Sequence, residues 1–140
     1  MKELILFLQN HQMLSIALII ILILLFIVEW FRTKLNARRI SPRETTHMMN
    51  HEDAIIVDIR NADAFHNGHI IGAISLPFPD LEKQYKKLEK NIKKPIIIVC
   101  ATGLESPRAA QFLSKHGYHT LIQAGGIRAW IEADMPLVKN

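Results

Sequence analysis

The feature that most constrains this chain is an apolar run of sixteen residues, from Met13 to Val28, that contains no charged side chain. Ser15 is its single polar interruption. As a helix the run is about 24 Å long, slightly less than the roughly 30 Å hydrocarbon core of a bilayer. Trp30 and Phe31 extend it into the interface, where aromatic rings are favoured. The run therefore predicts one membrane-spanning helix near the amino terminus.

The charges on either side of the run distinguish an anchor from a cleaved signal peptide, whose positive charges precede its apolar stretch. Here Lys2, offset by Glu3, precedes the run together with the amino terminus. Five basic residues follow the run: Arg32, Lys34, Arg38, Arg39 and Arg43. Basic residues favour the cytoplasmic side. The pattern therefore predicts an uncleaved single-pass anchor in the cell inner membrane, with the amino terminus outside and the rest of the chain in the cytoplasm.

The basic residues after the run also account for the positive charge of the whole chain. The formal net charge is +4, from 17 Lys and Arg against 13 Asp and Glu. From Glu44 to the carboxyl terminus, eleven basic residues balance eleven acidic ones. The basicity is therefore a collar beside the bilayer, suited to anionic lipid headgroups. Nothing in this distribution indicates nucleic acid as a partner.

These observations divide the chain into a tail and transmembrane helix (residues 1–31), a short basic connector (residues 32–39) and a single domain (residues 40–140). Within the domain, strand-like apolar runs alternate with helical patterns. This alternation predicts an α/β fold, in which a parallel sheet is flanked by helices on both faces. We expect strands within residues 53–58, 72–77, 95–100 and 119–124, and helices within residues 42–50, 61–65, 80–90, 106–116 and 125–135.

Cys100 is the only cysteine of the chain, so an internal disulfide is excluded and a reducing cytoplasmic location fits. It ends the most apolar predicted strand, and the five residues ATGLE separate it from a helix that starts at Ser106. Ligands of open parallel sheets bind beyond the carboxyl ends of the strands. Loop amides and a helix N-terminus both favour an anion there, a thiolate included. The alternative is a buried free cysteine that packs as a small apolar side chain, and position alone does not decide between the two.

Three sequence blocks resemble those of the rhodanese domain, a sulfurtransferase module. The segments VDIR and FHNGHIIGAISLP match its strand and turn block, CATGLES lies at the position of its six-residue active loop, and AGGIRAW resembles its closing block. The blocks occur in the family's order between about Ile40 and Val138. The resemblance implies a rhodanese-like fold behind an N-terminal membrane anchor, and sulfurtransferase activity that needs no cofactor and no metal.

The resemblance also implies a role for each part of the loop. Cys100 is the nucleophile: it takes sulfane sulfur from a donor, holds it as a persulfide, and passes it to a thiol or another nucleophilic acceptor. Backbone amides of the active loop cradle the anion, and Gly103 lets the backbone curl. We expect Ser106 to cap the following helix and to direct its hydroxyl toward the sulfur. The active loop consists of Ala101, Thr102, Gly103, Leu104, Glu105 and Ser106.

Other residues of the matching blocks have supporting interpretations. Asp58 and Arg60 are expected mainly to brace loops through hydrogen bonds. His69 is interpreted as a structural, hydrogen-bonding histidine rather than a general base, and Trp130 as a core residue. Arg108, in the first turn of the helix after the loop, is a candidate source of positive charge near the sulfur.

Two loop positions depart from the family pattern. Many active members carry arginine where this chain has Ala101 and Glu105, and those arginines help to bind anionic thiosulfate. A carboxylate beside a dianionic donor is repulsive, and we expect Arg108 to compensate only in part. The sequence therefore predicts that thiosulfate is a poor donor, and that a persulfide, a polysulfide or a protein is the natural one.

Two other functions compete with sulfur transfer. Phosphatases of related folds need a cysteine, five residues and then an arginine; this chain has Ser106 at that position and Arg108 two residues later, which disfavours phosphoryl transfer. The stronger alternative is a non-catalytic docking module that recruits or assists membrane-protein partners. The missing loop arginines favour docking, whereas the retained Cys100 favours chemistry.

Overall fold

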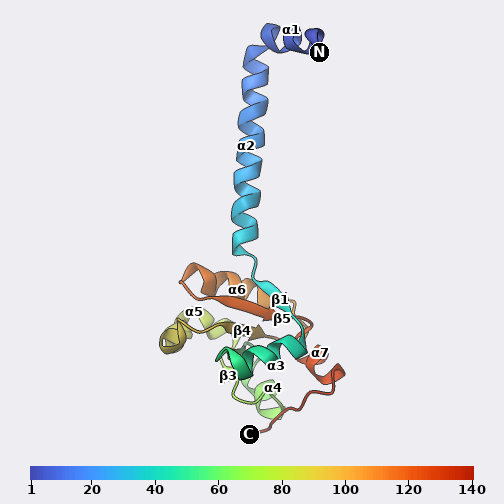
Figure 1. Cartoon of the computed structure of the whole chain (residues 1–140). Helices are drawn as coiled ribbons and strands as arrows, with labels where there is room; N and C mark the ends of the chain where they lie inside the picture. The colour runs from blue at the N-terminus through green and yellow to red at the C-terminus, as the bar shows by residue number, and fades with distance from the viewer. The chain divides into compact units, whose positions relative to one another are not determined.

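The computed structural model describes the backbone of residues 1–140, and the side chains of all of them except residues 4, 8 and 33–35. The chain forms two compact units, Met1–Leu35 and Asn36–Asn140 (Figure 1). The side chain of Lys34, one member of the predicted basic collar, lies outside the described part of the chain.

The first unit consists of two helices, α1 (Lys2–Asn10) and α2 (Gln12–Leu35). Within α2, the residues Gln12–Arg32 form a helix that is long and apolar enough to cross a membrane. Twenty-one residues rise about 32 Å, which matches the hydrocarbon core better than the apolar run alone. A signal sequence near the amino terminus meets the same criteria of length and composition.

The second unit is built on a five-stranded sheet in the order β1-β5-β4-β2-β3, in which every pairing is parallel. Strand β4 is the middle strand of this order, and its four residues are all buried. Ile96 and Ile98 pack on one face of the sheet, whereas Ile97 and Val99 pack on the other. The strands are β1 (Arg38–Ile40), β2 (Ile55–Asp58), β3 (Ile74–Ser75), β4 (Ile96–Val99) and β5 (Thr120–Gln123).

Helices cover both faces of the sheet, which confirms the predicted α/β architecture (Figure 1). On one face Met48 of α3 and Trp130 of α7 belong to one hydrophobic cluster. On the other face Leu81 of α5 and Leu113 of α6 belong to a second cluster. The α-helices of this unit are α3 (Pro42–His51), α4 (Ala62–Asn67), α5 (Leu81–Gln84), α6 (Ser106–Lys115) and α7 (Gly126–Glu132).

Two helix starts follow from local sequence signals. The Ser41 hydroxyl accepts a hydrogen bond from the Glu44 amide at 3.1 Å, and the Asn61 side chain accepts one from the Ala64 amide at 2.8 Å. These caps satisfy backbone donors that have no partner inside the helix. The predicted starts of α3 and α4 are therefore confirmed.

Strand β1 differs from the sequence-based expectation, which placed residues 32–39 in a connector. Arg38 and Arg39 form the edge of the sheet beside β5, with Ile40 as the one buried residue of the strand. A three-residue strand with one buried side chain has no recognisable periodicity along the sequence. Its backbone pairing with β5, a segment about eighty residues away, is what defines it.

The segment expected to form one amphipathic helix over residues 80–90 is also different. It is divided into η1 (Phe78–Asp80), α5 (Leu81–Gln84) and the 3₁₀ segment η2 (Tyr85–Asn91). The Tyr118 hydroxyl donates to the Tyr85 carbonyl at 3.2 Å. It therefore competes with the backbone amide that would donate to this carbonyl in a continuous α-helix. Leu81 and Leu88 are nevertheless both buried, as the apolar pattern predicts.

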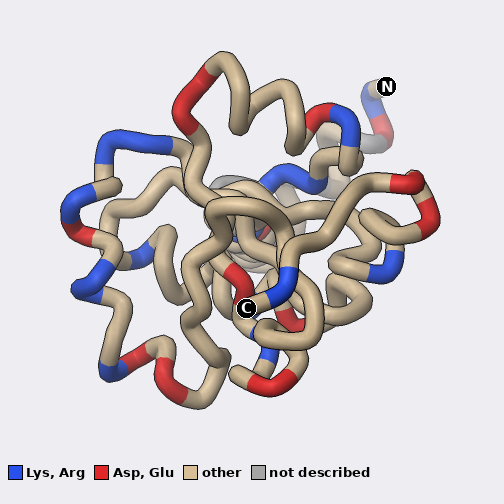
Figure 2. The backbone as a smooth tube through the Cα atoms, turned by 90° about the horizontal axis from the view of Figure 1, so that it is seen from below, with Lys and Arg blue, Asp and Glu red and all other residues tan. Residues whose placement is uncertain are grey.

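Acidic and basic residues are interspersed along the backbone of the second unit, as Figure 2 shows. This distribution agrees with the balanced charge count from Glu44 onward. The fold therefore presents Cys100 at the carboxyl end of a central strand in a domain without a large excess of either charge.

Candidate active site

The thiol of Cys100 lies directly beyond the central strand, because β4 ends at Val99. Cys100 continues the alternation of β4, so its side chain joins Ile96 and Ile98 in the cluster on the α5 and α6 face. The active loop then leads into α6, whose first residue is Ser106. The predicted location of the thiol at a strand end, in front of a helix, is therefore correct.

The active loop curls back so that a backbone amide meets the sulfur. The Gly103 amide donates to Cys100 Sγ at 2.9 Å. Gly103 has φ of +87°, and an added Cβ would lie 3.2 Å from the amide nitrogen of Gly125. A residue with a side chain is strained in this left-handed conformation. The glycine therefore permits the curl that brings its own amide to the thiol.

The electrostatics of the loop favour the thiolate. Burial by itself raises the pKa of the Cys100 thiol, but the Ser106 hydroxyl and the amides of Glu105, Ser106 and Gly103 outweigh burial and lower it below its ordinary value. Donors that converge on an anion stabilise it in this way. The arrangement can hold a sulfur anion without a metal.

Ser106 occupies a different helical position from the one expected. The N-cap residue of α6 is Glu105, which makes no side-chain capping hydrogen bond, and Ser106 is the first helical residue. The Ser106 hydroxyl is fully buried and forms no hydrogen bond of ordinary geometry within the described residues. Its influence on the thiol nevertheless lowers the pKa of Cys100. The prediction that Ser106 caps the helix was wrong, because Glu105 occupies the N-cap position and the Ser106 hydroxyl accepts no hydrogen bond from the helix amides.

Side chains of the active loop point outward while its backbone faces the sulfur. Ala101, Thr102, Leu104 and Glu105 are exposed, and Leu104 is 81% exposed. Cys100 itself is only 3% exposed. The loop therefore covers the thiol with peptide groups, and these four side chains form its exposed rim.

The glycine pair Gly125-Gly126 at the start of α7 supports the active loop, a contact that the sequence did not reveal. Gly126 has φ of +60°, and an added Cβ would lie 2.2 Å from the Cys100 carbonyl oxygen. The Ile127 amide donates to that oxygen at 2.9 Å, and the Arg128 amide donates to the Ala101 carbonyl at 3.1 Å. The start of α7 thus holds the start of the active loop, and the Gly-Gly sequence before Trp130 was the available signal.

Asp58 and Arg60 form a buried ion pair beside the site, and the predicted bracing contacts are present. The Arg60 Nη2 to Asp58 Oδ2 distance is 2.7 Å, and the same Nη2 donates to the Gly68 carbonyl at 2.7 Å. Asp58 lies opposite Val99 in the sheet. The pair therefore fastens the end of β2 to the turn after α4, and its hydrogen bonds are directed to that turn.

Two other residues of the matching blocks have structural contacts. His69 Nδ1 lies 2.8 Å from the Phe65 carbonyl, and its ring stacks on Phe65 with centroids 3.8 Å apart. Trp130 is buried, and its indole nitrogen donates to the Pro136 carbonyl at 3.0 Å. The interpretation of both residues as structural is confirmed. Within the described residues, no three His, Cys, Asp or Glu side chains gather as metal ligands.

Residues 41–133 match the family of rhodanese-like domains. The chain belongs to the rhodanese-like family. The matched range runs from the start of α3 to the end of α7, and it includes Cys100 and its active loop. Strand β1 precedes the matched range.

Individual relatives agree with this assignment. The chain is 33% identical over 142 residues to the uncharacterized protein YibN of Escherichia coli strain K12, covering 100% of this chain and 99% of that protein. It is 34% identical over 94 residues to the thiosulfate sulfurtransferase GlpE of Pseudoalteromonas translucida, covering 66% of this chain and 88% of that one. The rhodanese-like family to which the chain belongs therefore includes sulfurtransferases.

A solved structure shows the same architecture. The rhodanese-related protein of Thermoplasma volcanium superposes with a TM-score of 0.68 at 29% identity, covering 74% of this chain and 99% of that one. The second unit therefore has the fold of a rhodanese-like domain. The similarity to YibN extends over the whole chain and so includes the apolar segment of the first unit.

Proposed function

We propose that this chain is a membrane-anchored sulfurtransferase that carries sulfane sulfur as a persulfide on Cys100. The observation that carries the proposal is the 2.9 Å hydrogen bond from the Gly103 amide to Cys100 Sγ. It lies in a loop whose donors lower the pKa of the thiol despite burial. A purely structural cysteine in an apolar core has a raised pKa instead.

The transfer proceeds in two balanced displacements. The Cys100 thiolate attacks the outer sulfur of a donor R–S–SH; a new sulfur–sulfur bond forms, the bond to R–S breaks, and its electron pair leaves with R–S⁻. The product is the Cys100 persulfide. An acceptor thiolate then attacks the terminal sulfur of this persulfide, and the Cys100 thiolate leaves. Both thiolate and persulfide are anions, and the same loop amides suit both.

The composition of the rim supports an organic persulfide or a polysulfide rather than thiosulfate as donor. Ala101 carries no charge and Glu105 is an exposed carboxylate. Thiosulfate has its negative charge next to the sulfur that is transferred, so it approaches the loop against repulsion from Glu105. An organic persulfide carries its other charges farther from the reacting sulfur.

Anchoring through α2 is the second part of the proposal. It is supported by the length and composition of Gln12–Arg32, and by the basic residues that follow this segment in the sequence. Basic residues remain on the cytoplasmic side. The sulfur-transfer domain then acts in the cytoplasm beside the inner membrane, with anionic lipids near its basic collar.

Intact-mass measurement after exposure to sulfur donors tests the proposed chemistry. The full chain in detergent is incubated with glutathione persulfide, inorganic polysulfide or thiosulfate. We expect a gain of one sulfur atom, its removal by cyanide, and no gain in the Cys100→Ser variant. The experiment refutes catalysis in favour of the docking module if no donor modifies the wild-type chain while membrane proteins co-purify equally with wild type and Cys100→Ser.

A further inference from the structure

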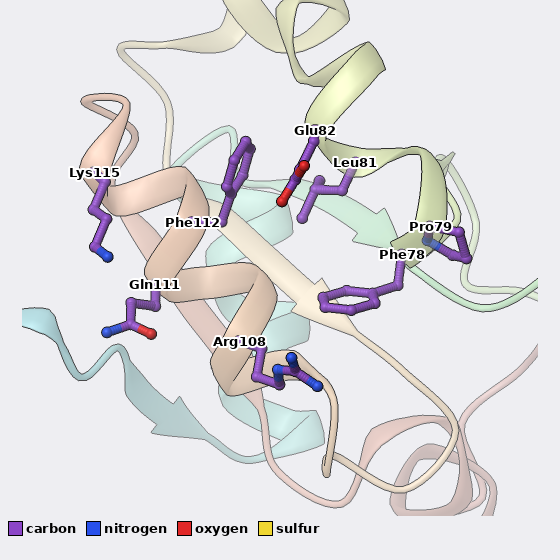
Figure 3. A pocket seen from close by; sticks show the side chains of 8 residues that line it. All are labelled: Phe78, Pro79, Leu81, Glu82, Arg108, Gln111, Phe112 and Lys115. Carbon is purple, nitrogen blue, oxygen red and sulfur yellow. The ribbon is translucent and has the colours of Figure 1, made fainter.

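A groove lies on the face of the sheet that carries the Cys100 side chain. It has a volume of about 440 Å³ and runs between the η1 and α5 segment on one side and α6 on the other (Figure 3). Its apolar surface comes from Phe78, Leu81 and Phe112. Small-molecule sites have roughly 300–1,000 Å³ and a mostly apolar lining with a few polar groups. The groove therefore has the size of a site for a small organic molecule.

The α6 wall of the groove is cationic. Arg108 and Lys115 both line it and both are exposed. They lie two turns apart on one helix, about 10.5 Å along its axis. Neither forms a salt bridge within the described residues. Gln111 lies between them, and Glu82 is the single acidic residue of the lining, so the wall offers two unpaired cations to an anionic ligand.

The groove begins beside the active loop. Arg108 is in the first turn of α6, and its guanidinium lies over the Phe78 ring, 5.6 Å from the ring centre. Phe78 packs against the cluster that contains Cys100, and its amide donates to Ile59 at the end of β2. Figure 3 shows the tip of β4 directed between Phe78 and Arg108. The Arg108 end of the groove is therefore the end that adjoins the active loop along the chain.

We propose that this groove binds the carboxylate-bearing arm of a small organic persulfide, the donor whose outer sulfur Cys100 takes. The inference rests on the proposed sulfur transfer and specifies its donor class. Arg108 and Lys115 pair with carboxylates of the donor, while its alkyl portion lies on Phe78 and Phe112. The charges that recognise the donor are thereby placed on α6 instead of in the active loop.

The groove by itself is smaller than a protein interface. A stable protein complex buries roughly 800 Å² on each partner, and the eight residues that line the groove would supply only part of such a contact. A small donor needs only the two cations and the apolar surface between them. Loss of the carboxylates from the donor must then weaken binding as much as loss of the cations does.

Charge-matched donors and variants test the proposal in the full chain in detergent. Persulfide formation on Cys100 is followed with glutathione persulfide and with the persulfide of glutathione diethyl ester, in which both carboxylates are blocked. We expect Lys115→Gln and Arg108→Gln each to raise KM for the free acid about twofold to fivefold, with kcat unchanged and with no effect on the ester. Lys115→Arg restores the wild-type KM. Lys86→Gln, which removes an exposed lysine outside the groove, leaves both donors unaffected.

A binding measurement separates failure of the groove from failure of the chemistry. S-methylglutathione, which cannot transfer sulfur, is titrated calorimetrically into the Cys100→Ser chain. Binding that Lys115→Gln weakens supports the groove. The groove proposal is overturned if S-methylglutathione does not bind, or if the wild-type chain forms the persulfide equally well from acid and ester donors. Absence of persulfide with every donor, together with intact S-methylglutathione binding, refutes the proposed transfer and leaves a binding site.

Discussion

We propose that Glu105 opposes anionic donors, because it combines an exposed carboxylate with a position at the N-cap of α6. A dianion about 6 Å from this carboxylate is repelled by about 1–3 kcal/mol when solvent screens the pair. We expect Glu105→Arg to lower KM for thiosulfate at least about fivefold at low salt, and less at high salt. Steady-state kinetics at two ionic strengths measure this effect.

Glu52→Arg is the matched control, since it makes the same change in net charge at an exposed position after α3. It is expected to leave KM for thiosulfate unchanged. Equal KM values for wild type and Glu105→Arg would show that electrostatics at the rim do not select the donor.

Ser106 is one of the groups that favour ionisation of the thiol. Its hydroxyl lowers the pKa of Cys100, against the effect of burial, so its removal must raise that pKa. In Ser106→Ala the thiolate fraction near neutral pH is smaller, and the midpoint of the pH profile for alkylation moves to higher pH. The rate at high pH, where the thiol is fully ionised in both proteins, stays the same.

Thr102→Ala is a suitable comparison, because Thr102 is an exposed hydroxyl residue of the same loop and is not one of the groups that lower the pKa of Cys100. Iodoacetamide rates across the pH range provide the measurement. A midpoint that is identical in wild type, Ser106→Ala and Thr102→Ala contradicts the assigned role.

At the scale of elements, the active site depends on the contact between the loop after β4 and the start of α7. Two peptide hydrogen bonds join them, and Gly126 leaves the space for their close approach. The two segments are separated by α6 and β5 in the sequence. The loop conformation is therefore a property of two packed elements rather than of the CATGLE segment alone.

Gly126→Ala tests this contact. The added Cβ would meet the Cys100 carbonyl at 2.2 Å, so the loop must shift and the two hydrogen bonds weaken. We expect a destabilisation of roughly 2–5 kcal/mol, from left-handed strain of about 1–2 kcal/mol and two lost hydrogen bonds of about 0.5–1.5 kcal/mol each. Persulfide formation on Cys100 should fall at least about tenfold. Thermal unfolding and intact-mass kinetics of the full chain report the two effects.

Gly72→Ala provides the control for strain. Gly72 has φ of +76°, but an added Cβ there meets no atom within 4 Å. This variant should lose only the strain energy and should keep its rate of persulfide formation. If both variants lose the same stability and the same activity, the support of the loop by α7 is not the cause.

At the scale of the whole molecule, the chain combines a membrane-sized helix with a separate folded unit. We expect the full chain to sediment with membranes and to resist extraction at high pH, because transfer of about twenty apolar residues out of the bilayer is very unfavourable. A chain that begins at Asn36 lacks this helix and should remain soluble. Release of the full chain by high pH would indicate that α2 does not span a membrane.

The orientation of the chain in the membrane can be tested with variants of the basic residues that follow the span. Replacing Arg32 and Lys34 with glutamine weakens the positive charge that directly follows the span, and should reduce the fraction of chains whose carboxyl terminus is cytoplasmic. Protease access to a tag at the carboxyl terminus measures that fraction. Unchanged access would leave no role for these two charges in orientation.

Much of the fold and of the candidate site follows from the sequence because its signals are local. The apolar run shows the membrane-sized helix, Ser41 and Asn61 show where α3 and α4 begin, and buried strand patterns show the parallel sheet. The candidate role of Cys100 follows from its place between an apolar strand and a helix. Each of these signals lies within a few consecutive residues, so its physical meaning is present in the sequence itself.

The tertiary structure alone decided the features that need two distant segments. Strand β1 exists through its pairing with β5, and the Tyr85 carbonyl is engaged by Tyr118 rather than by a continuing helix. Gly126 lies against Cys100 only because α7 returns to the loop, and the groove appears only where η1 and α5 lie across from α6. Sequence periodicity describes which side of an element is buried, but not which element it meets. The thiol and its loop were therefore predictable, whereas the contact between the loop and α7 and the groove beside α6 were not.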